Sequence, residues 1–73
     1  MEKSLEELVF IVEEAPDGGY IAKALGVSII TEADDLETLR SQVLDAVRCH
    51  FAEENQRPRI IRLHMVKDEV LAS

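Results

Sequence analysis

Hydrophobic residues in the first part of the chain follow the pattern of a short strand. Residues 8–12 form an apolar run that is rich in β-branched side chains, which is typical of a strand. Leu8 and each second residue after it point to one face, and Val9 and Ile11 point to the other. Because both faces are apolar, we expect this strand at the centre of a sheet or beneath a subunit contact.

A strong turn signal follows this strand at residues 15–19. Asp17 can hydrogen-bond its own backbone, and Gly18 and Gly19 permit positive φ. The sequence therefore predicts a hairpin here, with Tyr20 packing its ring over the sheet just after the turn.

Three further strands are predicted, at residues 20–24, 27–32 and 59–66. In the last of these, side chains point alternately to the two faces of the sheet. Leu63 and the residues two positions before and after it lie on one face, and Arg62 and the residues two positions before and after it lie on the other.

A helix is predicted to begin within residues 33–37. Asp34 or Asp35 can be its N-cap, because a carboxylate there accepts hydrogen bonds from free backbone N–H groups. Asp34 and Glu37 also have the spacing of a capping box.

One face of this helix is apolar, and its stripe follows the helical period. The stripe consists of Leu36, Leu39, Val43, Ala46, Val47 and His50, with Leu44 and Phe51 on its flank. Arg40 also falls inside the stripe, where its stem can lie on apolar surface while the guanidinium reaches water. The polar residues 53–58, which include a proline, are expected to end the helix.

The element order predicts a single α+β domain over residues 1–73, with its core at about residues 5–66 and a tail at 67–73. We expect a two-layer βββαβ fold: a mixed four-stranded sheet with one covering helix, in which the fourth strand lies beside the first. The other sheet face would carry Val9 and Ile11, or their alternates, without a helix above them. A bare apolar face predicts a homo-oligomer, a dimer or higher.

Length and composition exclude several classes. With 73 residues, the chain has room for one domain. No apolar stretch is long enough to span a membrane, and the acidic beginning of the chain does not resemble a signal peptide. The single cysteine, Cys49, cannot form an internal disulfide, which fits a reducing compartment. The expected location is the cytoplasm.

The net charge of −7 argues against direct nucleic-acid binding, because phosphate recognition needs a basic surface. The acidic excess lies in residues 1–36, whereas residues 37–73 are balanced. Such an acidic half can receive a basic partner, or it can serve solubility alone.

No catalytic or cofactor motif stands out: the chain has no phosphate-binding glycine loop and no nucleophile elbow, and its spacing brings no metal ligands together. Cys49 and His50 are adjacent on a helix and therefore face different directions. His64 could meet a carboxylate such as Glu13 as a proton relay, or simply as a surface pair. We predict no catalytic residue, no metal and no cofactor.

Three arginines surround the start of the fourth strand: Arg57, Arg59 and Arg62. They fit a solvated edge. They also fit an interface cluster that pairs with the acidic half of another subunit, since the guanidinium binds carboxylates in bidentate fashion.

Two segments resemble the HicB-like antitoxin family: residues 13–22 (EEAPDGGYIA), similar to its first hairpin, and residues 31–37 (TEADDLE), similar to its helix entry. The chain departs from the family at Ala33, where a glycine is usual, and at Arg40, where an apolar residue is usual. The residues after Val66 are too few for the DNA-binding module that full antitoxins append.

The resemblance implies a truncated ribonuclease-H-like fold without ribonuclease-H catalysis. It also implies a domain that binds and blocks a small basic mRNA-cleaving toxin, so we expect a non-catalytic protein-interaction domain. Two rivals remain open: a small enzymatic or ligand-binding module that uses Glu13, Glu14 or His64, and an oligomeric structural protein without a ligand.

Overall fold

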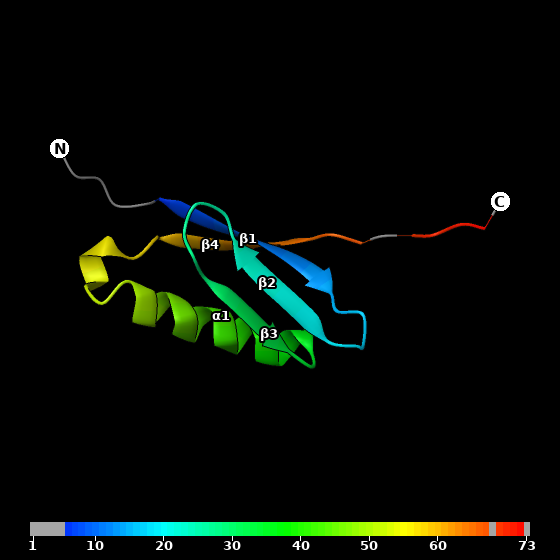
Figure 1. Ribbon diagram of the computed structural model, residues 1–73. Coiled ribbons are helices and arrows are strands. Elements are labelled where there is room, and N and C mark those ends of the chain that lie inside the picture. The colour runs from blue at the N-terminus through cyan, green and yellow to red at the C-terminus, as the bar shows by residue number, and fades with distance from the viewer. Residues whose placement is uncertain (1–5, 68, 73) are drawn as a thin grey trace.

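A computed structural model describes residues 6–67 and 69–72 of the chain. Its elements follow the predicted order (Figure 1): β1 (Glu7–Glu14), β2 (Tyr20–Ala24), β3 (Ile30–Ala33), α1 (Leu36–His50), a short 3-10 helix (Glu54–Gln56) and β4 (Ile60–Met65). The sheet order is β3-β2-β1-β4. β2 is antiparallel to both of its neighbours, and β4 is parallel to β1.

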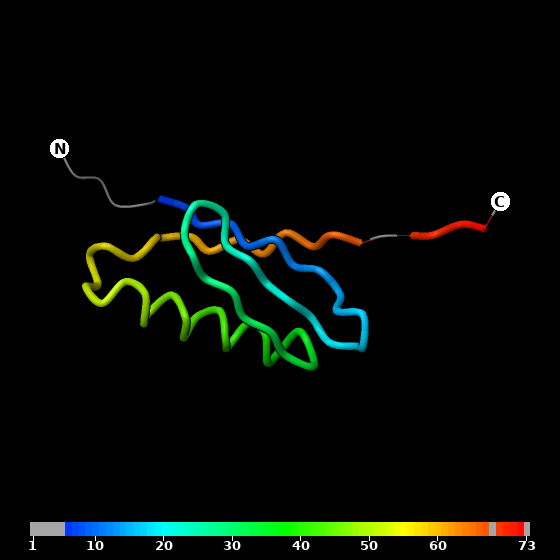
Figure 2. The backbone as a smooth tube through the Cα atoms, viewed as in Figure 1, coloured from blue at the N-terminus to red at the C-terminus, as the bar shows by residue number. Residues whose placement is uncertain are grey.

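The helix α1 lies on one face of this sheet, so the α+β prediction of a mixed four-stranded sheet with one covering helix is confirmed (Figures 1 and 2). The predicted domain, residues 1–73, also includes residues 1–5, 68 and 73, which lie outside the described residues. Within the described part of the chain, no helix is both long enough and apolar enough to cross a membrane.

The core lies between α1 and one of the two apolar faces of β1, the face that carries Leu8, Phe10 and Val12. Leu8, Phe10 and Val12 are at most 2% exposed. The other buried hydrophobic residues come from β2, the loop before β3 and the helix: Ala22, Ile29, Leu39, Val43 and Val47. The period of two along β1 therefore identified the core strand and its two faces, and the structure shows which of them faces α1.

The hairpin turn between β1 and β2 is confirmed. The backbone N–H of Ala15 donates to the Gly19 carbonyl at 3.0 Å, and that of Gly18 donates to the Ala15 carbonyl at 3.1 Å. Gly18 and Gly19 both adopt positive φ, at 100° and 83°. Tyr20 is half-buried and packs against the edge of the core, as predicted.

The third strand begins later than the sequence predicted. It starts at Ile30 rather than at residue 27, because the apolar residues before Ile30 belong to a turn and not to the strand. Gly26 adopts a φ of 92°, and the Ile29 N–H donates to the Val27 carbonyl at 3.1 Å. Ile29 is nevertheless buried, so its side chain packs in the core although its backbone lies in a loop. β4 is also slightly shorter than predicted, at Ile60–Met65.

The N-cap of α1 is Asp35, one of the two predicted candidates. Its backbone is extended, and its carboxylate accepts a hydrogen bond from the Thr38 N–H at 2.7 Å. The predicted capping box between Asp34 and Glu37 is wrong, because the third helical residue after this cap is Thr38.

The Thr38 N–H lowers the pKa of Asp35, because a backbone hydrogen bond favours the charged carboxylate. A pKa that is lower in the folded state than in the unfolded state stabilises the fold above the ordinary value of 3.8, and this stabilisation is lost as the pH falls through the folded-state pKa. Asp35→Ala is therefore expected to lower stability at neutral pH and to differ less from the unmodified protein at about pH 3. Urea unfolding at both pH values measures this, with Asp34→Ala as the uncapped neighbour. An equal loss at both pH values would contradict the role of the charge.

The apolar stripe of α1 is confirmed at Leu39, Val43 and Val47, which are buried. His50 is an exception, because it is exposed while Phe51 packs against the core instead. The helix packs mainly against β3 and β2, so it lies toward one side of the sheet. The helix-facing side of β4 is consequently only partly covered.

Candidate functional site

A polar hollow of about 400 Å³ opens where the β1–β2 turn, the end of β3 and the start of α1 meet. We call it the acidic hollow. It is lined by Ala15, Asp17, Gly18, Tyr20, Glu32, Ala33, Asp34, Thr38 and Gln42. Three of these residues carry carboxylates and none is basic.

Strand pairing places the two ends of the acidic hollow together. Tyr20 stands opposite Glu14 on one side and opposite Ala33 on the other, so it joins the hairpin turn to the end of β3. The chain then turns directly into α1 through Asp34. Residues that are far apart in the sequence thus form one wall.

Sequence reasoning identified part of this site. Asp17, Gly18, Tyr20 and Asp34 were predicted as turn or cap residues, and all four line the acidic hollow. Glu32, Thr38 and Gln42 were not singled out. Thr38 and Gln42 are four residues apart and therefore share a helix face, which was the available signal.

The acidic hollow is suited to binding positive charge. Carboxylates without a nearby cation create a negative potential that attracts and orients basic groups. Among the described residues, no group of three or more His, Cys, Asp or Glu side chains could hold a metal ion. With a volume of about 400 Å³ and a lining without basic residues, the acidic hollow suits the lysine or arginine side chains of a protein.

Two of the three arginines near β4 have partners within the described chain. The Arg57 Nε donates to the Phe51 carbonyl at 2.9 Å, which satisfies the end of α1. Arg62 pairs with Glu7 on the neighbouring β1, and the hydrogen bond from Arg62 to this carboxylate raises the pKa of the guanidinium. Arg59 is exposed. Their role in an interface stays a prediction.

The sheet face opposite α1 carries Val9 and Ile11, both half-buried. Each has charged or polar neighbours across the strands: Val9 lies opposite Arg62, and Ile11 lies between Lys23 and His64. The face therefore alternates apolar and polar side chains instead of presenting a continuous apolar surface. Association through it stays a prediction.

The residues of the catalytic rival form no hydrogen bond or ion pair with one another in the described part of the chain. His64 lies opposite Ile11 and forms no ion pair with Glu13 within the described chain. Cys49 is a free, exposed thiol.

Comparison with known proteins gives two clear relatives. The chain is 50% identical over 58 residues to a UPF0150 protein of Archaeoglobus fulgidus. The aligned residues make up 80% of this chain and 85% of the relative. It is 43% identical over 67 residues to a UPF0150 protein of Thermotoga maritima, covering 92% and 93% of the two chains. No known family profile matches the chain, and a search of the solved structures found no significant match.

Proposed function

This chain belongs to the UPF0150 family, and from that premise we propose that it is a non-catalytic, HicB-like protein-interaction domain. Its partner is a small basic mRNA-cleaving protein, which it binds and blocks. The binding site is the acidic hollow, whose carboxylates are Asp17, Glu32 and Asp34.

This proposal rests on the position of the two segments that resemble HicB-like antitoxins. Residues 13–22 and 31–37 resemble the HicB-like antitoxins, and together they supply seven of the nine residues that line the acidic hollow. The segments thus converge on one surface whose charge is opposite to that of the partner which the resemblance implies. Such charge complementarity accelerates encounter and selects the orientation of binding.

Co-expression tests this function. A short basic protein encoded beside this chain's gene is expected to arrest growth when expressed alone and to be neutralised when this chain is co-expressed. The combined substitutions Asp17→Lys, Glu32→Lys and Asp34→Lys are expected to abolish the neutralisation. Calorimetry should show about 100-fold weaker binding, because three attractive contacts become repulsive.

A matched control separates the site from net charge. Asp45→Lys, Glu53→Lys and Glu54→Lys make the same change in net charge in the second half of α1 and after its end, and none of these residues lines the acidic hollow. These substitutions should reduce affinity only slightly. Equal weakening by both triple variants would reject the acidic hollow as the site, and the absence of any binding would reject the function.

A further inference from the structure

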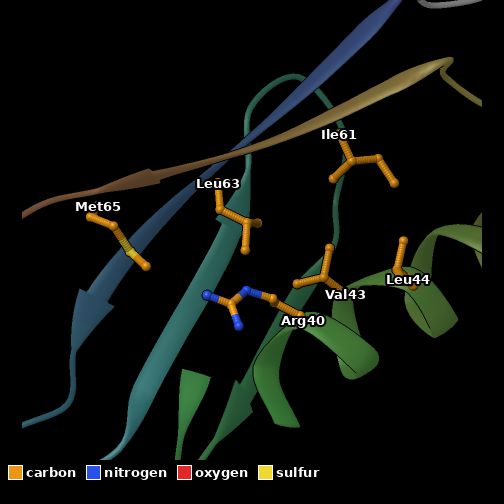
Figure 3. Close-up of a pocket in the computed structure, with 6 residues that line it drawn as sticks. All are labelled: Arg40, Val43, Leu44, Ile61, Leu63 and Met65. Carbon is orange, nitrogen blue, oxygen red and sulfur yellow. The ribbon is translucent and has the colours of Figure 1, made fainter. Parts of the chain in front are cut away.

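A second hollow lies between α1 and the edge strand β4, and its walls are apolar (Figure 3). We call it the β4 groove. It measures about 430 Å³ and is lined by Arg40, Val43, Leu44, Ile61, Leu63 and Met65. It exists because α1 packs toward β2 and β3 and leaves the inner side of β4 partly uncovered. Leu44 and Met65 are 44% and 48% exposed.

Arg40 gives this groove a positive charge. Its side chain extends from α1 beneath Leu63, toward the side where Met65 lies (Figure 3). Within the described chain, its guanidinium takes part in no hydrogen bond or ion pair. The β4 groove therefore fits an occupant that combines aliphatic side chains with a carboxylate.

The chain itself carries such a segment just beyond β4. Val70 and Leu71 are 92% and 80% exposed, and Glu69 precedes them. Residues 69–72 lie past the end of the sheet, away from both of its faces (Figure 1). These two side chains leave apolar surface exposed, and burying it against a partner would be favourable.

The outer edge of β4 offers a place for this segment. β4 is the last strand of the order β3-β2-β1-β4, so one side of its backbone has no strand partner in the described chain. The Val66 N–H still donates to the Val12 carbonyl at 2.8 Å, so the extended conformation continues beyond Met65.

We infer that two copies of this chain pair antiparallel along β4 and exchange residues 69–72. A two-fold axis near Val66 places Leu71 of one copy opposite Ile61 of the other, and Glu69 opposite Leu63. Because side chains alternate along a strand, Glu69 and Leu71 share the face of Ile61 and Leu63. Leu71 then enters the β4 groove of the other copy, and Glu69 meets its Arg40.

A second copy fits better than the chain's own segment. To reach its own groove, the chain would have to reverse between Met65 and Leu71, and this stretch contains neither glycine nor proline. The antiparallel passage of a second copy needs no reversal. It also uses the same surface on both copies, which is the geometry of a closed dimer.

Sedimentation equilibrium at micromolar concentration tests the exchange. The unmodified chain is expected to sediment at twice its 8.2 kDa mass. Leu71→Asp should weaken the dimer at least about 30-fold, because it places a carboxylate against apolar walls. The control is Leu25→Asp, since Leu25 is 57% exposed in the β2–β3 loop and its replacement should leave the dimer intact.

A charge exchange tests the register. Arg40→Glu and Glu69→Arg are each expected to weaken the dimer about tenfold, and the double variant should restore it. All the substituted side chains are exposed, so circular dichroism should show an unchanged fold.

Three outcomes would overturn the exchange. They are a monomeric unmodified chain, a dimer that Leu71→Asp leaves intact, and a failure of the double variant to restore association. A dimer that resists Leu71→Asp but dissociates with Ile11→Lys would place the contact on the opposite sheet face instead.

Discussion

Replacing Phe10 with Ala is expected to lower the free energy of unfolding by about 3–5 kcal/mol. The Phe10 side chain is fully buried at the centre of β1. It lies between Ala24 on β2 and Leu63 on β4, so a cavity there would border both neighbouring strands. A domain of this size has a total stability of about 4–11 kcal/mol, so this single substitution would remove a large share of it.

Urea unfolding of Phe10→Ala and Ile30→Ala measures this effect. Ile30 is also an apolar strand residue but is 68% exposed, so its truncation should cost less than about 0.5 kcal/mol. Both variants should be compared at one protein concentration, because association would add to apparent stability. Similar midpoints for the two variants would show that the core does not depend on Phe10.

The fold was predictable wherever burial alternates regularly along the chain. The alternation separated Leu8, Phe10 and Val12 from Val9 and Ile11, but because both sets are apolar it left open which set faces the helix. The double apolar character of β1 also predicted its central place between β2 and β4. These inferences succeeded because a strand's side-chain period is fixed by its backbone.

The boundary of β3 was not predictable in the same way. Val27 and Ile29 have the composition of a strand, but the positive φ of Gly26 and the turn after it decide their conformation. An apolar residue can serve the core from a loop, as Ile29 does, and composition alone does not distinguish the two cases.

The position of α1 over β2 and β3 explains why a charged residue, Arg40, occurs in the apolar stripe of the helix. The apolar stripe showed which face of the helix packs inward, but not which strands it covers. Since α1 packs toward β2 and β3, Arg40 lines the β4 groove instead of entering the core. In the same way, Thr38 and Gln42 join the acidic hollow only because α1 and the end of β3 approach each other there.

Gly19→Ala is expected to lower the free energy of unfolding by about 3 kcal/mol, more than Gly18→Ala, which should cost about 1 kcal/mol. Both glycines adopt positive φ, so both substitutions strain the backbone. At Gly19 an added Cβ would also lie 2.8 Å from the Ala33 carbonyl oxygen, whereas at Gly18 no atom lies within 4 Å. Because that oxygen belongs to the backbone at the end of β3, it cannot move without shifting the residues before α1.

The two glycines therefore separate conformational strain from steric contact within a single turn. Gly18→Asn should recover part of the loss caused by Gly18→Ala, since asparagine tolerates the left-handed region. Gly19→Asn should not recover stability, because its Cβ meets the same carbonyl oxygen of Ala33. Urea unfolding of the four variants gives the comparison. Equal losses of unfolding free energy at the two positions would mean that the end of β3 can shift to accommodate the added Cβ. The close approach of the hairpin turn to the end of β3 would then contribute nothing to stability.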